Sequence, residues 1–266
     1  MSISVGVVKI AEDADFKHFK EMCESTEGWR LEVNKHKTMV WTKVNDLSSF
    51  NMVKVRTVFD DVSAATLYDV IHDPVYRKTW DNSMVEGCEL CVINPNNDIG
   101  YYAIKAPPPL KNRDFVTQRS WLDTGDEKII FNHSVNHVKR LPKKGVIRGV
   151  SFLTGYYIRR INDKSCQLTY VSQSDPKGSL PAWAINKLTK ILAPKVISRI
   201  HKASQKYPSW KSKNRPEYKP WLNPEQMKND LPPFNPADVR PMTSSASMES
   251  LEDGDVCEED IKDDDL

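Results

Sequence analysis

Alternation of apolar and polar residues is the feature that most constrains the fold of this 266-residue chain. It appears in three runs before residue 60, and in the third run Val53, Val55 and Phe59 share one face while Lys54 lies on the other. Six further strands are predicted, at 84–93, 99–105, 113–122, 128–138, 145–161 and 165–174. Nine such runs, mostly joined by short turns, favour an antiparallel sheet.

Helical periodicity is confined to three segments. Residues 13–27 and 63–81 form the first two, and Pro74 breaks the second or starts a new turn in it. The third, 181–203, carries one apolar stripe made of Ala184, Ile185, Leu188, Ile191 and Leu192. The order predicts an α+β fold in which a curved nine-stranded antiparallel sheet packs around this long C-terminal amphipathic helix.

Composition places the chain among globular proteins of a reducing compartment. A hydrophobic fraction of 39% is enough for a real core. The N-terminus has no basic region followed by an apolar leader, and no apolar run approaches the length of a membrane span. We therefore expect a cytoplasmic protein whose five cysteines are reduced, and we expect it to be a monomer.

The net charge of +2 conceals a division between the body and the C-terminus. Residues 249–266 hold ten acidic residues and one lysine, while the rest of the chain has a net charge of about +11. A basic body indicates an anionic partner, either nucleic acid or a membrane surface. The chain lacks a basic helix or an aromatic sheet motif for RNA, so we expect no nucleic-acid partner.

Four regions are predicted along the chain. They are an N-terminal segment (1–11), a folded domain (12–207), a Pro-rich extended segment (208–240) and a disordered acidic tail (241–266). The tail either keeps the protein soluble or competes for the basic surface of the body. Ser250 lies three residues before Asp253 in a pattern that acidophilic kinases recognise, which makes it a candidate phosphorylation site.

Motifs for catalysis and metal binding are missing from the sequence. There is no nucleophile elbow, no phosphate-binding loop and no dinucleotide fingerprint. Cys88 and Cys91 are three apart on a strand and so point to opposite faces, which argues against a shared metal. His133 and His137 have no partner at zinc-site spacing. We therefore predict no enzyme activity, no metal and no cofactor.

The segment Y-R-K-T-W-D, residues 76–81, is the strongest local candidate for a binding site. Arg77 and Asp81 are four apart and share a helix face, with Trp80 on the adjoining surface. An exposed ion pair beside a core tryptophan is the commoner interpretation. An arginine held by a carboxylate and walled by an aromatic ring would instead bind an anion such as phosphate.

A second candidate is the segment G-Y-Y-A-I-K-A-P-P-P-L-K-N-R-D-F, residues 100–115. Tyr102 and Phe115 fall on neighbouring strands and could face one cavity, and the three prolines make a stiff loop with Leu110 at its tip. On the long helix, Trp183 lies opposite the apolar stripe, near Lys187 and Lys190. It packs against a neighbouring loop or lies at a membrane interface with the lysines on headgroups.

Several segments in order resemble one family. They are Y-R-K-T-W-D, the 100–115 segment, G-V-I-R-G-V-S-F, D-P-K-G-S-L-P-A-W-A-I-N-K and Y-K-P-W-L-N-P-E-Q. Together they are similar to the START (StAR-related lipid transfer) domain, in the branch of the phosphatidylcholine transfer protein, over roughly residues 12–225. The resemblance implies a helix-grip fold around a lipid tunnel, and carriage of phospholipids between membranes without a metal or an energy source.

Residue by residue, the resemblance assigns Arg77 and Asp81 to the lipid headgroup. It places Tyr102, Phe115 and Phe152 around choline, where the family pattern has Trp, Tyr and Tyr. The expected cargo is therefore phosphatidylcholine and phosphatidylethanolamine, because these rings make a weaker cage for a quaternary ammonium.

The expected tunnel gate combines the proline loop with the long helix, and its membrane-contact residues are Pro107, Pro108, Leu110, Trp183, Lys187 and Lys190. The alternative function is a lipid sensor that binds phospholipid, shuttles it slowly and offers the Pro-rich segment to a protein partner.

Overall fold

The computed structural model describes residues 3–108, 110–178, 180, 193–227 and 231–240. Its α-helices are α1 (Asp13–Glu24), α2 (Ala64–His72), α3 (Pro74–Trp80) and α5 (Ala193–Lys211). The strands are β1 (Arg30–Lys35), β2 (Thr38–Lys43), β3 (Met52–Phe59), β4 (Met84–Asn94), β5 (Asn97–Ile104), β6 (Asn112–Asp123), β7 (Glu127–Ser134), β8 (Val146–Arg148), β9 (Val150–Asn162) and β10 (Ser165–Asp175).

Nine of the strands form one continuous antiparallel path in the order β1-β2-β3-β10-β9-β7-β6-β5-β4, which confirms the predicted sheet. The tenth, β8, lies off this path and pairs in parallel with the start of β6. It arises because the predicted strand 145–161 is divided at Gly149. The Gly149 N–H donates to Asp114 O, and a Cβ at this position would lie 2.4 Å from the Phe115 ring.

Two other boundaries differ from the sequence prediction. The strand predicted over 128–138 ends at Ser134, and His137 instead accepts the Lys139 N–H at the start of a 3-10 turn, η1 (Val138–Arg140). Helix α5 continues to Lys211, beyond the predicted end at residue 203, with Pro208 inside it. Residues 181–192, which include the whole predicted apolar stripe, lie outside the described residues.

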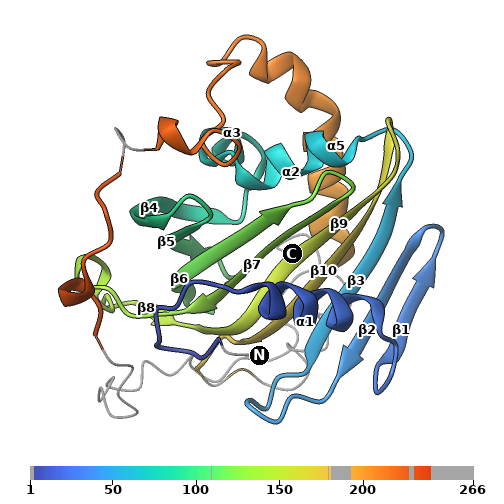
Figure 1. The fold of residues 1–266 in the computed structure, drawn as a ribbon. Helices are drawn as coiled ribbons and strands as arrows, with labels where there is room; N and C mark the ends of the chain where they lie inside the picture. The colour runs from blue at the N-terminus through green and yellow to red at the C-terminus, as the bar shows by residue number, and fades with distance from the viewer. Residues whose placement is uncertain (1–2, 109, 179, 181–192, 228–230, 241–266) are drawn as a thin grey trace.

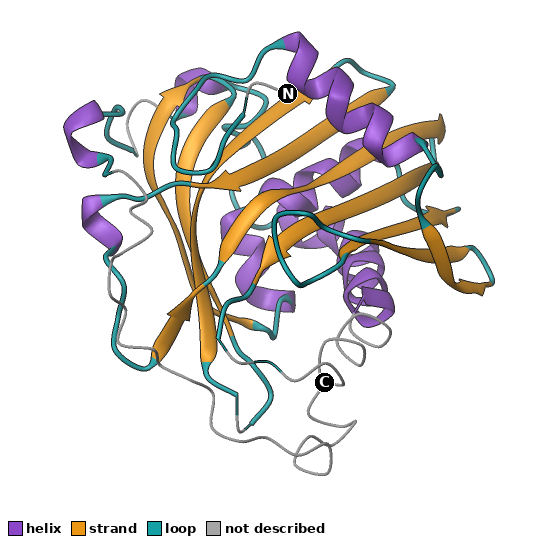
Figure 2. Cartoon of the chain, turned by 90° about the horizontal axis from the view of Figure 1, so that it is seen from below, coloured by secondary structure: helices purple, strands orange, loops and turns teal. Residues whose placement is uncertain are grey.

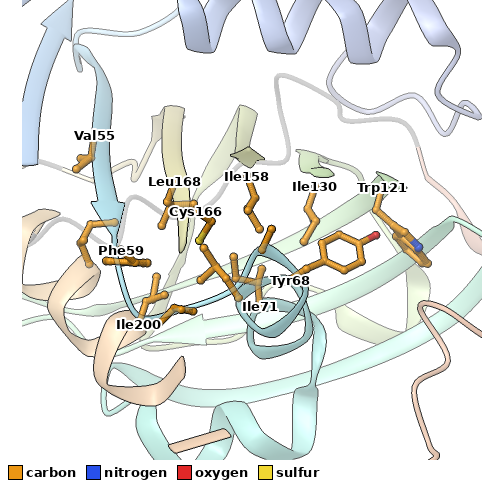
Figure 3. Close-up of a cluster of buried hydrophobic side chains, with 14 of the residues drawn as sticks. Val55, Phe59, Tyr68, Ile71, Trp121, Ile130, Ile158, Cys166, Leu168 and Ile200 are labelled. Atoms are coloured by element: carbon orange, nitrogen blue, oxygen red, sulfur yellow. The ribbon is translucent and has the colours of Figure 1, made fainter. Parts of the chain in front are cut away.

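The sheet curves around helices on its inner face, as Figure 2 shows. Helices α2 and α5 pack there against each other and against β3, β9 and β10, while α1 lies on the outer face against β7 and β10 (Figure 1). The main core fills the inner layer (Figure 3), with Val55, Phe59, Tyr68, Ile71, Trp121, Ile130, Ile158, Cys166, Leu168 and Ile200 among its members. The face of β3 predicted to be apolar is the face in this core.

The outer face of β3 is covered as well. The Lys54 side chain is 1% exposed, donates to Ser25 O just after α1 and has its Nζ 4.0 Å from the centre of the Trp29 ring. A lysine that alternation alone would place in solvent is therefore buried beneath the C-terminal end of α1.

A C-terminal strap, residues 212–227 and 231–240, packs against the body. Trp221 is 7% exposed, and its indole N–H donates to Asp69 Oδ1 at 2.7 Å. Lys219 binds the other Asp69 oxygen at 2.6 Å, and the last residue of α5, Lys211, binds Asp73 at 3.0 Å. These contacts tie the strap and α5 to both ends of the junction between α2 and α3.

The end of the strap covers the edge of the sheet. Phe234 N–H donates to Val92 O of the edge strand β4 at 2.8 Å, and Val239 forms an antiparallel bridge with His137. An edge strand left open presents unpaired backbone groups to other chains. The strap pairs part of this edge and brings the chain at Arg240 beside Asn136.

Candidate functional site

A cavity of about 760 Å³ lies between the inner face of the sheet and helices α2, α3 and α5. This volume is in the upper part of the range for sites that enclose a small organic ligand. Both apolar and polar side chains line the cavity. The sequence-predicted residues among them are Arg77, Asp81, Tyr102, Pro107 and Phe115.

Helix α3 places Arg77 and Asp81 at this cavity. Its start is fixed by Asp73, whose carboxylate accepts the Val75 and Tyr76 N–H groups, and Pro74 occupies the first turn. The Arg77 side chain lies inside the protein yet keeps 26% of its accessible surface, and it lines the cavity. The pair predicted from the sequence is therefore at the cavity wall and is not an exposed surface pair.

Arg77 is incompletely neutralised. Its Nε lies 3.9 Å from Asp81 Oδ2, too far for a hydrogen bond, and this Nε has no hydrogen-bond partner among the described residues. The Asp81 oxygen instead accepts the hydroxyl hydrogen of Tyr102 at 2.7 Å. A buried cation whose donors are partly unused is an available site for an anion.

Aromatic rings surround this cation. The Arg77 guanidinium carbon lies 5.7 Å from the centre of the Trp80 ring and 5.6 Å from that of Tyr102. Burial opposes its charge, but Tyr156, Tyr102 and Asp81 outweigh burial and hold the pKa of Arg77 above its ordinary value. Burial also raises the pKa of Tyr102 and of Tyr156. The site therefore presents a charged guanidinium among neutral phenols.

A second arginine lines the same cavity, but its charge is already matched. Arg119 donates to both oxygens of Asp98, through Nε at 3.1 Å and through Nη2, and it lies 3.9 Å from Glu89. Sequence reasoning missed this cluster. The two arginines differ in how many carboxylates neutralise them. Arg119 lies beside two, whereas Arg77 lies beside one, which also accepts a hydrogen bond from Tyr102.

A continuous polar row crosses the cavity wall, and sequence reasoning missed it too. Directly opposed residues on five neighbouring strands form it: Asp98, Arg119, Asn132, Thr154 and Ser172. All five line the cavity. Strand alternation could have revealed the row, because each residue has the parity of inward-facing neighbours such as Tyr102, Ile130 and Tyr170.

The three aromatic residues expected around choline do not all meet. Tyr102 and Phe115 are directly opposed on β5 and β6, and both line the cavity. Phe152 is not among the cavity-lining residues, so the structure does not bring it together with Tyr102 and Phe115. The reason is a β-bulge, in which β9 advances from Leu153 to Ser151 while β10 advances one residue, so that Ser151 takes the inward position.

The proline loop also differs in part from expectation. Pro107 is buried and lines the cavity, and Pro108 is exposed. Leu110, predicted at the tip of this loop, is only 7% exposed. Its N–H donates to Pro107 O at 3.0 Å, and this turn folds the side chain back onto the body.

Ser83 joins the elements where the exposed lining residues Lys105 and Val196 bring the cavity to the protein surface, and we call this part of the wall the mouth. Its carbonyl accepts the Lys105 N–H at 2.7 Å, and its hydroxyl oxygen accepts a hydrogen from Arg199 Nη1 of α5 at 3.1 Å. These three residues line the cavity together with Pro107 and Val196. The predicted contact residues Trp183, Lys187 and Lys190 and the predicted phosphorylation site Ser250 lie outside the described residues.

Catalytic and metal chemistry find no obvious centre in the described part of the chain. Within it, no group of three or more His, Cys, Asp or Glu residues could hold a metal ion. His133 and His137 are both buried, and burial lowers the pKa of each. No described helix is long and apolar enough to cross a bilayer.

The fold and the cavity define a binding protein of the helix-grip class, with a helix set against a curved sheet and an interior that mixes apolar walls with one underused cation. Comparison with known proteins agrees with this class. The START domain model matches residues 9–209, and the chain belongs to the START domain family. By family it is thus a non-enzymatic lipid-binding and lipid-transfer domain.

Two kinds of relative place the chain within this family. It is 42% identical over 252 residues to START domain-containing protein 10 of Mus musculus, covering 94% of this chain and 86% of the relative. It is 29% identical over 202 residues to the phosphatidylcholine transfer protein of Mus musculus, covering 72% of this chain and 94% of the relative. The crystal structure of human STARD10 matches with a TM-score of 0.84 and 42% identity, over 92% of this chain and 99% of that chain.

Proposed function

We propose that this protein extracts phosphatidylcholine and phosphatidylethanolamine from membranes, encloses one molecule and delivers it to another membrane. The observation that carries the proposal is Arg77, a cavity-lining cation with an unpartnered Nε. The lipid phosphate would accept from this guanidinium, because a buried anion requires a paired cation and hydrogen bonds. Asp81 would orient Arg77 when the cavity is empty.

The apolar part of the lipid sets the energetic need for an enclosed cavity. A diacyl phospholipid carries roughly 30 methylenes, each costing about 0.8 kcal/mol in water. Exchange between a bilayer and an apolar protein interior avoids this exposure, so transfer needs no energy source. Apolar lining residues such as Val53, Ile71 and Ile200 support such an exchange.

Headgroup tolerance follows from the aromatic residues at the site. Tyr102 and Phe115 offer ring faces to a choline ammonium, but the bulge at Phe152 withholds the third ring. An incomplete cage favours choline less strongly over ethanolamine. We therefore infer that both headgroups are accepted.

Opening of the cavity is proposed to occur at the membrane. The loop that contains Pro107, Pro108 and Leu110 would separate from the 181–203 helix, with Ser83 releasing Lys105 and Arg199. Trp183, Lys187 and Lys190 would then contact headgroups. We infer a cytoplasmic monomer that binds membranes transiently.

The acidic tail is proposed to act as a brake. Its net charge of about −9 opposes that of the body, and phosphorylation of Ser250 would add up to two negative charges. A chain that ends at Arg240 should bind anionic vesicles more tightly than the full chain. Equal binding by the two chains would remove this part of the proposal.

Lipid loading of Arg77→Ala tests the headgroup assignment. The variant should extract at least about tenfold less phosphatidylcholine from vesicles, the loss expected for one charged hydrogen bond of about 1.5–3 kcal/mol. Arg77→Lys keeps the charge without the planar fork and should fall between the two. The matched control is Arg159→Ala, which removes an arginine that contacts Gln167 on the surface. Normal extraction by folded Arg77→Ala protein would overturn the assignment.

The alternative function, a lipid sensor that docks a partner through the Pro-rich segment, makes a different prediction in the same vesicles. A sensor binds lipid but moves it between vesicles slowly, whereas a carrier does both. Burial of Trp221 against α2 favours the carrier, because that part of the segment already has a partner in its own chain.

A further inference from the structure

An exposed loop beside the mouth of the cavity has features that the proposed function does not use. We name it the basic loop, and it comprises Lys139, Arg140, Leu141, Pro142, Lys143, Lys144 and Gly145. Leu141 is 56% exposed, in contrast to the buried Leu110. Lys139, Lys143 and Lys144 are exposed around it, so one apolar side chain projects among three cations.

The position of this loop is fixed by its two ends. It runs from η1 to β8, and β8 pairs with Asn112–Asp114 at the start of β6. The segment immediately before Asn112 contains Lys105, Ala106 and Pro107, which line the cavity at its mouth. The basic loop and the mouth are therefore attached to the same end of the same strand.

Arg140 and Lys143 anchor the loop to Glu86 of β4. Arg140 pairs with Glu86 of β4 at 2.7 Å, lies 4.5 Å from the centre of the Tyr101 ring and donates to Cys88 Sγ at 3.0 Å. Lys143 reaches the other Glu86 oxygen at 3.3 Å. Lys139 and Lys144, in contrast, make no ion pair with any described residue. Leu141 lies between the two anchored residues Arg140 and Lys143, so docking the loop on another surface requires little further ordering.

This chemistry suits an anionic bilayer. Lysines near a surface that contains acidic lipids are attracted to it, and an apolar side chain between them can enter the interface. A bilayer accepts a single protruding leucine without a complementary pocket, which a protein partner would have to supply. Lys105, exposed at the mouth, adds a charge of the same sign.

We propose that the basic loop is a docking site for anionic phospholipid membranes, and that it sets the mouth of the cavity against the bilayer. This proposal rests on the proposed function as a membrane-to-membrane carrier. It assigns an apolar membrane contact to Leu141, a role that the sequence analysis predicted for Leu110.

The test measures binding of the full chain to phosphatidylcholine vesicles with and without phosphatidylserine. Lys139→Gln/Lys144→Gln should bind the phosphatidylserine vesicles about 10- to 30-fold more weakly. Leu141→Ser should weaken binding several-fold on both vesicles.

Matched controls lie at the opposite end of the sheet. Lys35 is the last residue of β1, Lys164 lies in the β9–β10 turn, and the 51%-exposed Ile161 lies near the end of β9. Lys35→Gln/Lys164→Gln and Ile161→Ser make the same chemical changes there and should bind like the parent chain.

Three results would overturn the proposal. The loop variants could bind like the parent, the control variants could lose as much binding, or removal of the loop charges could increase binding. Increased binding after removal of the loop charges would indicate that the loop binds acidic residues of the chain itself.

Loading with fluorescent phosphatidylcholine from detergent micelles separates this proposal from the carrier function. Loop variants should load normally because the cavity is intact. Normal loading with unchanged vesicle binding would reject the loop alone, whereas a parent chain that does not load would reject the carrier.

Discussion

Tyr102 of β5 donates its hydroxyl hydrogen to Asp81 of α3 at 2.7 Å, and this bond takes the carboxylate oxygen that lies nearest Arg77. The bond couples the sheet to the helix that carries the cation. It also explains why the i,i+4 pair is open at 3.9 Å instead of closed, and why Arg77 keeps unused donors for a ligand.

Tyr102→Phe should close this pair. Without the phenol hydrogen, Asp81 is free to accept from Arg77, which draws the guanidinium away from the cavity while the aromatic ring remains. We expect phosphatidylcholine loading to fall about tenfold and the free energy of unfolding to fall by about 1–3 kcal/mol. Equilibrium lipid binding and urea unfolding measure the two. Tyr170→Phe is the control, because Tyr170 lines the cavity and makes no contact with Asp81, and equal effects of the two would contradict the argument.

Two glycines should respond differently to alanine. A Cβ on Gly149 would lie 2.4 Å from the Phe115 ring, which can move into the cavity. Gly149→Ala should therefore alter lipid loading and lower the free energy of unfolding by about 1–3 kcal/mol. A Cβ on Gly155 would lie 2.3 Å from Ile130 O on the next strand, and that backbone cannot yield. Gly155→Ala should therefore lower the free energy of unfolding by about 4 kcal/mol or more.

Gly100→Ala is the control for this pair, since its Cβ would lie an ordinary 3.5 Å from the nearest atom, Cys88 O. Thermal unfolding with and without bound phosphatidylcholine separates the effects on fold and on cargo. A Gly149→Ala protein with parent stability and parent loading would show that the Phe115 ring is not confined by this contact.

The sheet and its helices could be predicted because both follow local periodicity. Val53, Val55 and Phe59 mark an inward face at every second residue of β3. Arg77 and Asp81 could be predicted as partners because helix geometry fixes i,i+4 neighbours. What periodicity cannot contain is long-range pairing, and the Tyr102 bond to Asp81 joins residues 21 apart.

The errors have the same origin. The family resemblance placed Phe152 around choline, but it cannot reveal the extra residue in β9 that gives the inward position to Ser151. Leu110 was placed at the tip of a stiff loop of three prolines, yet its side chain is buried and its N–H donates to Pro107 O. Lys54 looked solvent-facing because the sequence of β3 does not reveal that α1 ends above it.

Trp221 should be the main anchor of the C-terminal strap. Its ring lies parallel to that of His72, with centres 5.6 Å apart, and His72 lines the cavity. Trp221→Ala should lower the free energy of unfolding by about 3–5 kcal/mol. Trp221→Phe keeps the ring contact but leaves Asp69 without its indole donor, so about 1–3 kcal/mol is expected.

Urea unfolding gives the free energy of unfolding of both Trp221 variants. Leu222→Ala serves as the control, because Leu222 is the next residue and its side chain is 45% exposed. The order Ala, Phe, control should also hold for lipid loading if the strap supports the wall of the cavity through His72. A Trp221→Ala protein as stable as the control would show that the strap is not anchored by this residue.

Lys54 should make stability depend on pH in the alkaline range. Burial lowers its pKa from 10.5 to about 8. The unfolded chain therefore binds more protons than the folded chain between about pH 8 and 10.5, and stability rises with pH as the folded lysine loses its charge.

Lys54→Met removes this dependence. From pH 7.5 to 9 the parent should gain about 1 kcal/mol relative to the variant. Burial raises the pKa of the neighbouring Cys23 thiol, which acts in the opposite direction above pH 9, so the comparison is made below that value. Urea unfolding across this range gives the difference directly. A difference that stays constant, or that shrinks in favour of the variant, would mean that Lys54 remains charged beneath α1.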